Sequence, residues 1–96
     1  MFKCETIFED GVSTICFMED EPPLRWLQNQ VGGYIESPPF FEEPPQTRVY
    51  FDEEGLLHQL QPNLLATERA LQLGYNLTQP LVGPVVFVTE ESPRGR

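Results

Sequence analysis

Basic residues, histidine and cysteine are all scarce in this chain of 96 residues, and each scarcity excludes a class of function. Six lysines and arginines stand against 15 acidic residues, which gives a formal net charge of -9. Direct binding to nucleic acid is not expected, because it requires Lys and Arg to replace the counterions around the phosphates. Binding to an anionic membrane surface is not expected either, because such surfaces attract clustered Lys and Arg. The charge is compatible with a basic protein partner.

The residues that a metal site or a catalytic triad needs are also missing. One histidine and two cysteines do not supply the ligands of a zinc site, and the acidic spacing of a calcium loop is absent. His58 has no serine or cysteine in a nucleophile elbow to activate, and the acidic residues Asp52 and Glu53 are several residues away in the sequence. We therefore expect a protein that is not an enzyme and that binds no metal or cofactor.

The chain has no long apolar run. No segment approaches the ~18 consecutive apolar residues of a membrane-spanning helix. The first residues lead into an alternating pattern instead of the apolar region of a secretory signal. Two cysteines without a C-x-x-C spacing are typical of reduced thiols. Together these observations predict a cytoplasmic protein.

Two alternating segments, residues 2–9 and 12–18, predict an amino-terminal hairpin. Asp10-Gly11 between them favours a two-residue type I′ turn, whose central positions both require positive φ. The register that follows places Ile15 and Phe17 on the core face of the hairpin.

The same register decides the expected fate of the two cysteines. It pairs Cys4 with Phe17, so that Cys4 and Cys16 point to opposite faces of the hairpin. Side chains on opposite faces cannot be joined by a disulfide. We therefore expect no disulfide between them.

Two helices are predicted, at residues 22–31 and 64–73. Gly32-Gly33 ends the first helix, with Gly32 as a left-handed cap, and Asn63 is the expected N-cap of the second. The apolar positions of the second helix are Leu64, Leu65, Ala70, Leu71 and Leu73.

The remaining strands are predicted at residues 34–36, 47–51, 56–60 and 85–88. The turn Asp52-Glu53-Glu54-Gly55 joins the second and third of these as a hairpin. The last is a continuous apolar run, which is typical of a strand buried on both faces.

The sequence therefore predicts one compact α+β domain at 1–89, followed by a polar tail at 90–96. Four prolines make residues 37–46 a loop. The expected element order is β-β-α-β-β-β-α-β, with a mainly antiparallel sheet and both helices packed on one of its faces.

Two sets of residues are candidates for binding. Backbone amides, a phenol and a carboxamide can hold a small polar, nucleotide-like ligand. These groups come from Gly32, Gly33, Tyr34 and Asn63. Aromatic side chains ringed by acidic ones instead predict a protein interface. That interface set is Trp26, Phe40, Phe41, Asp52, Glu53 and Glu54.

Several blocks of the chain resemble the bacterial and phage family called domain of unknown function 3846. The blocks are Val31-Gly32-Gly33-Tyr34-Ile35-Glu36, Asp52-Glu53-Glu54-Gly55-Leu56, Leu60 with Asn63 and Ala66, and Leu81-Val82-Gly83-Pro84-Val85-Val86. The resemblance covers residues 24–89, and the chain departs from it in the proline-rich loop and in the amino-terminal hairpin turn. It implies a compact α+β domain encoded on phages, plasmids and similar elements, and it supplies no catalytic residues.

The leading hypothesis is a small acidic binding protein of a phage or mobile element, acting in the host cytoplasm as an inhibitor or adaptor of a host protein. The alternative is a protein that binds or sequesters a small polar ligand. Self-association into a homodimer, through a sheet edge or a helix face, is compatible with both.

Overall fold

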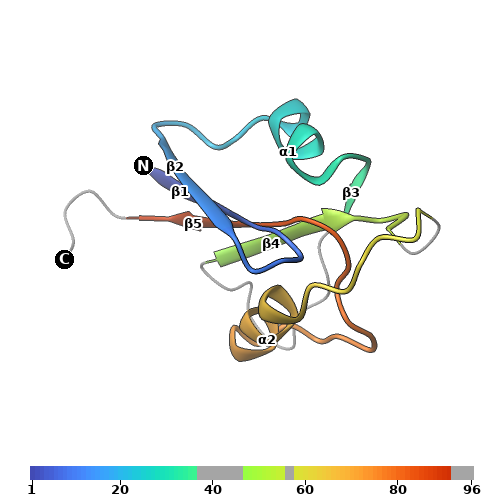
Figure 1. Cartoon of the computed structure of the whole chain (residues 1–96). Coiled ribbons are helices and arrows are strands. Elements are labelled where there is room, and N and C mark those ends of the chain that lie inside the picture. Colours follow the sequence, from blue (N-terminus) through green and yellow to red (C-terminus); the bar gives the residue numbers. More distant parts are fainter. Residues whose placement is uncertain (37–46, 56–57, 92–96) are drawn as a thin grey trace.

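The computed structural model describes residues 1–36, 47–55 and 58–91. Its elements are β1 (Phe2–Ile7), β2 (Ser13–Met18), α1 (Leu24–Val31), β3 (Ile35–Glu36), β4 (Thr47–Asp52), α2 (Leu64–Gln72) and β5 (Val85–Glu90). The strands form one five-stranded sheet in the order β2-β1-β5-β4-β3, and every neighbouring pair is antiparallel. The predicted α+β class with an antiparallel sheet is confirmed (Figure 1).

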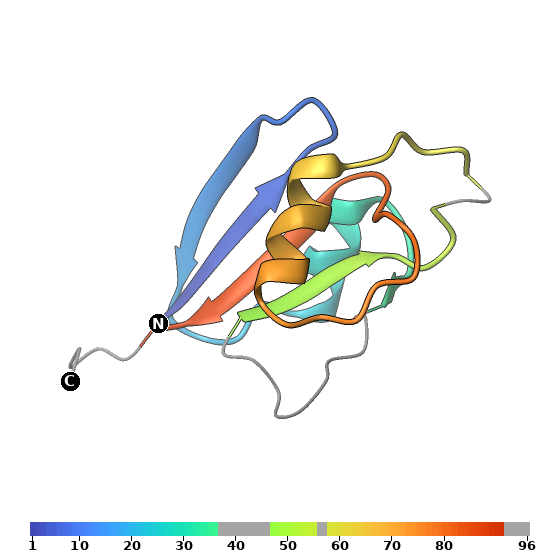
Figure 2. The same ribbon diagram turned by 90° about the horizontal axis from the view of Figure 1, so that it is seen from below.

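The two helices lie on opposite faces of this sheet, so the prediction that both pack on one face is wrong (Figure 1). Seen from below, α2 crosses in front of the sheet while α1 lies behind it (Figure 2). The central strand β5 supplies the physical reason. Val85 and Phe87 join the core beneath α2, whereas Val86 and Val88 join the core beneath α1. A strand that is apolar on both faces needs a cover on each side.

Each face of the sheet therefore has its own core. The α2-side core consists of Ile7, Val49, Ala66, Ala70, Tyr75, Leu81, Val85 and Phe87. The α1-side core consists of Cys4, Leu27, Val31, Val86 and Val88, with Phe2, Cys16, Met18, Trp26, Ile35 and Tyr50 packed against it. Within the described residues, no helix is both long and apolar enough to span a membrane.

The amino-terminal hairpin is present, but its loop has three residues instead of two. Phe8 N–H donates to the Val12 carbonyl at 2.8 Å, and Gly11 N–H donates to the Phe8 carbonyl at 2.9 Å. Gly11 has φ 89°, which gives a type I turn followed by a left-handed glycine. Asp10 stabilises this form, because its Oδ1 accepts a hydrogen bond from Val12 N–H at 3.0 Å.

The longer loop shifts the register of β2 by one residue and turns its side chains to the other face. Cys4 is paired with Cys16, not with Phe17. Ile15 and Phe17 are exposed instead of buried. The predictions that these two residues lie in the core, and that Cys4 and Cys16 point to opposite faces, are both wrong.

The strand predicted at 56–60 is not formed by residues 58–60, and residues 56–57 lie outside the described part of the chain. His58 N–H donates to the Glu54 carbonyl and Leu60 N–H to the Gly55 carbonyl, so the backbone turns locally instead of pairing with β4. The observed order is β-β-α-β-β-α-β. The neighbours of β4 are β3 and β5.

Both helix ends predicted from capping residues are confirmed. α1 ends at Gly32, which has φ 85°, and α2 begins after Asn63, whose side chain accepts a hydrogen bond from Ala66 N–H. The buried face of α2 differs from the predicted one, because it consists of Ala66 and Ala70. Leu64, Leu65 and Leu71 are exposed.

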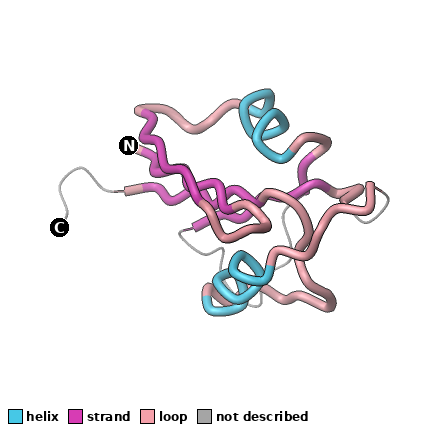
Figure 3. The backbone as a smooth tube through the Cα atoms, viewed as in Figure 1, coloured by secondary structure: helices cyan, strands magenta, loops and turns pink. Residues whose placement is uncertain are grey.

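Two long connections, from β4 to α2 and from α2 to β5, gather at one end of the molecule (Figure 3). They are joined by an isolated antiparallel bridge between Pro62 and Val82. Asn63 N–H donates to the Leu81 carbonyl and Gly83 N–H to the Gln61 carbonyl, both at 2.8 Å. These bonds hold the start of α2 against the segment that leads into β5.

Candidate functional site

Strand β2 forms one edge of the sheet. It pairs with β1 on one side, and no described strand pairs with its other side (Figure 2). Ile15 and Phe17 are 51% and 59% exposed along it, and Val12 just before it is 56% exposed. The opposite edge, β3, has only two residues. β2 is therefore the long open edge of the sheet.

The backbone of β2 presents, at regular spacing, groups that no strand of the described residues pairs with. Because Phe8 and Val12 form a hydrogen-bonded pair, alternation along an antiparallel ladder directs residues 14, 16 and 18 towards β1. The N–H and C=O groups of Ser13, Ile15 and Phe17 then point away from the sheet. Backbone donors and acceptors of this spacing match those of another extended strand.

Charge is distributed unevenly along this edge. Residues 12–18 contain no charged side chain. Glu9 and Asp10 precede them, and the exposed Glu19, Asp20 and Glu21 follow. Natural edge strands are commonly protected by a charged residue, a proline or a bulge within the strand, and β2 has no charged residue or proline. The edge is an uncharged strip with acidic groups at both ends.

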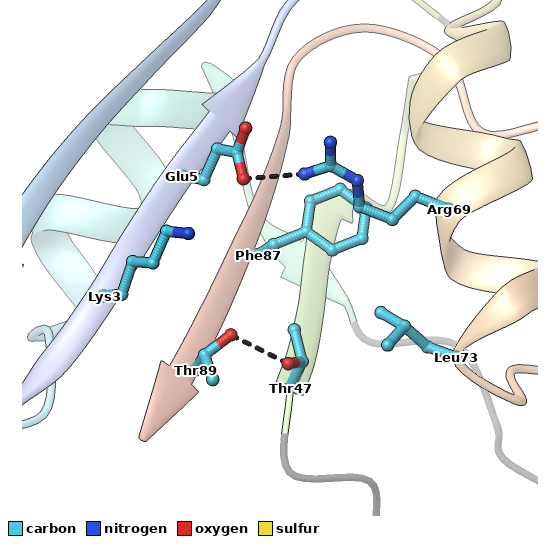
Figure 4. Close-up of a pocket in the computed structure, with 7 residues that line it drawn as sticks. All are labelled: Lys3, Glu5, Thr47, Arg69, Leu73, Phe87 and Thr89. Carbon is cyan, nitrogen blue, oxygen red and sulfur yellow. Dashed lines mark hydrogen bonds and ion pairs between the residues drawn. The ribbon is translucent and has the colours of Figure 1, made fainter. Parts of the chain in front are cut away.

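A pocket of about 160 Å³ lies on the α2 side of the sheet, one strand in from this edge (Figure 4). It is lined by Lys3, Glu5, Thr47, Arg69, Leu73, Phe87 and Thr89. Arg69 Nη1 lies 2.6 Å from Glu5 Oε1, and its guanidinium carbon lies 5.5 Å from the centre of the Phe87 ring. Glu5 is paired with Ile15, so the pocket and the open edge share one face.

The ligand site predicted from sequence is brought together only in part. Gly32, Gly33 and Tyr34 line an open depression of about 380 Å³ with Gln28 and Asn29. Tyr34 is 65% exposed, so its phenol is available to a ligand.

Asn63 does not join that depression. Its side chain is fully buried, its Nδ2 donates to the carbonyls of Ile7 and Gly83 at 2.9 Å each, and its Oδ1 accepts from Ala66 N–H at 3.1 Å. These three hydrogen bonds of the carboxamide all go to backbone groups. Asn63 therefore has a structural role and cannot reach a ligand beside Tyr34.

The turn that follows β4 brings His58 into contact with the carboxylate of Asp52, six residues before it in the sequence. His58 Nδ1 lies 3.0 Å from Asp52 Oδ2, and Glu54 N–H donates to Asp52 Oδ1 at 2.9 Å. Asp52 is buried, and a Cβ added to Gly33 would lie 2.9 Å from both of its carboxylate oxygens. Within the described residues, the polar contacts of His58 go to Asp52 and Glu54, neither of which is a nucleophile that a base would activate. The arrangement holds the turn in place.

The predicted interface residues are scattered. Trp26 is half-buried against the α1-side core, and Asp52 is buried, so neither is free to contact a partner with its whole side chain. Glu53 and Glu54 are exposed. Phe40 and Phe41 lie outside the described residues.

In comparisons with known proteins, no family model, curated protein or solved structure matches the chain. The resemblance to domain of unknown function 3846 thus stays a prediction. The described residues also contain no group of three His, Cys, Asp or Glu side chains that could hold a metal ion.

Sequence reasoning missed the open edge because it placed Ile15 and Phe17 in the core. A signal for it was present in the sequence, since residues 12–18 are uncharged and lie between two acidic clusters. That pattern is equally typical of a buried strand until the register and the strand order are known.

Proposed function

We propose that this protein is a small acidic binding module without enzymatic activity, which adds an extended segment of a partner protein to the open edge of β2. The observation that carries the proposal is the six-residue uncharged edge strand with Ile15 and Phe17 exposed. In strand addition, backbone hydrogen bonds supply affinity, and alternate side chains supply specificity.

The charges at the ends of β2 define the chemistry of the partner. Glu9 and Asp10 lie before the uncharged strip, and Glu19, Asp20 and Glu21 lie after it. A partner segment with an uncharged centre and Lys or Arg at both ends complements this pattern. The overall charge of -9 speeds the encounter with such a basic segment.

The same charges disfavour pairing between two copies of β2. Antiparallel copies centred on Ile15 would place Asp10 opposite Asp20 and Glu9 opposite Glu21. Like charges directly opposite one another are destabilising. The proposed partner is therefore a different protein, as an inhibitor or adaptor of a host protein requires, and a homodimer through this edge is disfavoured.

The face beside β2 favours apolar side chains in the partner. Ile15 and Phe17 lie on the α2 side of the sheet, opposite Glu5 and Lys3 of β1. Alternate residues of an added strand would stand next to these two apolar side chains. We infer that the partner segment alternates, with Val, Ile or an aromatic residue on this side.

A synthetic peptide tests the proposal directly. Its centre alternates valine and threonine, and it carries lysines at both ends. We expect it to bind and to protect the amides of Ser13, Ile15 and Phe17 from hydrogen exchange. Ile15→Lys places a charge in the strip and is expected to weaken binding at least about tenfold, or about 1.4 kcal/mol. Titration calorimetry and exchange NMR measure the two effects.

The matched control is Leu71→Lys, because Leu71 on α2 is as exposed as Ile15, at 51%. It is expected to leave peptide affinity unchanged. A second control is the same peptide with a proline at its centre, which cannot complete the strand ladder. Equal binding of the proline peptide, or a greater loss in Leu71→Lys than in Ile15→Lys, would contradict the proposal.

The depression beside Tyr34 supports a second candidate function, the binding of a small polar, nucleotide-like ligand. Gly32, Gly33 and Tyr34 line it together, as the sequence suggested. If this function holds, native mass spectrometry of protein purified under mild conditions should detect a bound small molecule, and Tyr34→Ala should remove it. A bare wild-type protein under the same conditions would count against this candidate and leave the open edge as the remaining site.

A further inference from the structure

The two cysteines face each other across the amino-terminal hairpin. Cys4 of β1 and Cys16 of β2 are directly paired in the antiparallel register. Because residue 16 is directed towards β1, the two cysteines form a hydrogen-bonded pair, whose Cα atoms are about 5.5 Å apart and whose side chains lie on one face. A disulfide spans about 4.4–6.8 Å between Cα atoms. The register therefore places the two Cα atoms within the range that a disulfide spans, with both side chains on one face.

The two thiols differ in access. Cys4 is 1% exposed in the α1-side core, whereas Cys16 lies on the edge strand and is partly exposed. Burial, and to a smaller extent the charge and hydrogen bond of the neighbouring Cys16 thiol, raise the pKa of Cys4 to about 11. A reagent in solution therefore reacts first with Cys16. The buried Cys4 can react only with a mixed disulfide that has already formed on Cys16.

We infer that Cys4 and Cys16 form a dithiol redox site, which a low-molecular-weight disulfide converts into a cross-strand disulfide between β1 and β2. This site is independent of the proposed binding function. The cysteines lie on the α1 side of the sheet, and Ile15 and Phe17 lie on the α2 side.

The chemistry proceeds by two thiol–disulfide exchanges. First, the Cys16 thiolate attacks a small disulfide RSSR, such as oxidised glutathione, which forms a Cys16–S–S–R bond and releases one thiolate RS⁻. Second, the Cys4 thiolate attacks Cys16 Sγ, which forms the Cys4–Cys16 bond and releases a second RS⁻. The protein loses two electrons and two protons, and RSSR is reduced to two RSH.

A pyridyl disulfide makes each exchange visible, because every step releases one coloured thiopyridone. The folded wild-type protein is expected to release two equivalents and to lose two hydrogens in intact mass without forming dimers. When the mixed disulfide is prepared at acid pH and the pH is then raised, the second release should accelerate about tenfold for each pH unit, as long as the pH stays below the pKa that burial raises for the Cys4 thiol. The cause is the growing thiolate fraction of buried Cys4.

Two variants separate the steps. Cys4→Ala is expected to release one equivalent and to stop at the mixed disulfide. Cys16→Ser should release none while folded and one in urea, because Cys4 is then accessible. Oxidised glutathione should give the same intramolecular product as the pyridyl reagent. Disulfide-linked dimers as the main product, or a wild-type protein that stops after one equivalent at pH 9, would overturn the inference.

Discussion

Replacing Asn63 with alanine is expected to destabilise the protein by about 4 kcal/mol. The side chain is fully buried and makes three hydrogen bonds to backbone groups of three different segments. Loss of the N-cap bond to Ala66 N–H costs about 1 kcal/mol. The carbonyls of Ile7 and Gly83 each lose a buried donor, at about 1–3 kcal/mol per group. Against a typical stability of about 5–15 kcal/mol, this loss is large.

Urea unfolding measures the effect, and two further variants assign it. Asn63→Asp keeps the capping oxygen but points a carboxylate at two carbonyls, so it is expected to be at least as destabilised as Asn63→Ala. Asn76→Ala changes an exposed asparagine and is expected to stay within about 0.5 kcal/mol of wild type. If Asn63→Asp were as stable as wild type, the bonds to Ile7 and Gly83 would contribute nothing.

The second large effect is expected at Tyr75, whose hydroxyl binds backbone groups of β4 that no described strand pairs with. β3 pairs only with Phe51 and Asp52, so it does not reach the first half of β4. There the Tyr75 hydroxyl accepts a hydrogen bond from Val49 N–H at 3.2 Å and donates one to the Thr47 carbonyl at 3.0 Å. Its ring is fully buried in the α2-side core.

Tyr75→Phe keeps the ring and removes both hydrogen bonds, and it is expected to cost about 2 kcal/mol. Tyr75→Ala also leaves a cavity and is expected to cost about 4–5 kcal/mol. Tyr34→Phe is the matched control, because that tyrosine is 65% exposed and should change stability by less than about 0.5 kcal/mol. Equal stability of Tyr75→Phe and wild type would show that the hydroxyl does not support β4.

Local chemistry explains the parts of the fold that were predictable. Gly32 ends α1 in a left-handed conformation, and Asn63 caps α2, because these residues satisfy backbone groups a few positions away in the sequence. The run 85–88 is a strand buried on both faces, as its unbroken hydrophobicity indicates. Such a strand also requires that each face of the sheet be covered by other residues. The prediction that both helices pack on one face did not take this into account.

The first hairpin shows that a loop longer by one residue changes which side chains of β2 are exposed. Asp10-Gly11 signals a hairpin in either case, but the bond from Val12 N–H to Asp10 belongs to the three-residue loop. Because side chains alternate along a strand, the one-residue shift moves Ile15 and Phe17 out of the predicted core and brings Cys16 opposite Cys4. The open edge at β2 and the dithiol of Cys4 and Cys16 both follow from that shift.

The sequence by itself determined the α+β class, both helix caps, the doubly buried strand and the acidic surface, since each depends on neighbouring residues or on composition. Only the tertiary structure decided the strand order, the opposite placement of the helices, the open edge at β2, the contact of His58 with Asp52, and the separation of Asn63 from Tyr34. These features depend on contacts between residues distant in sequence, and residue patterns do not specify which of several compatible pairings has the lowest free energy.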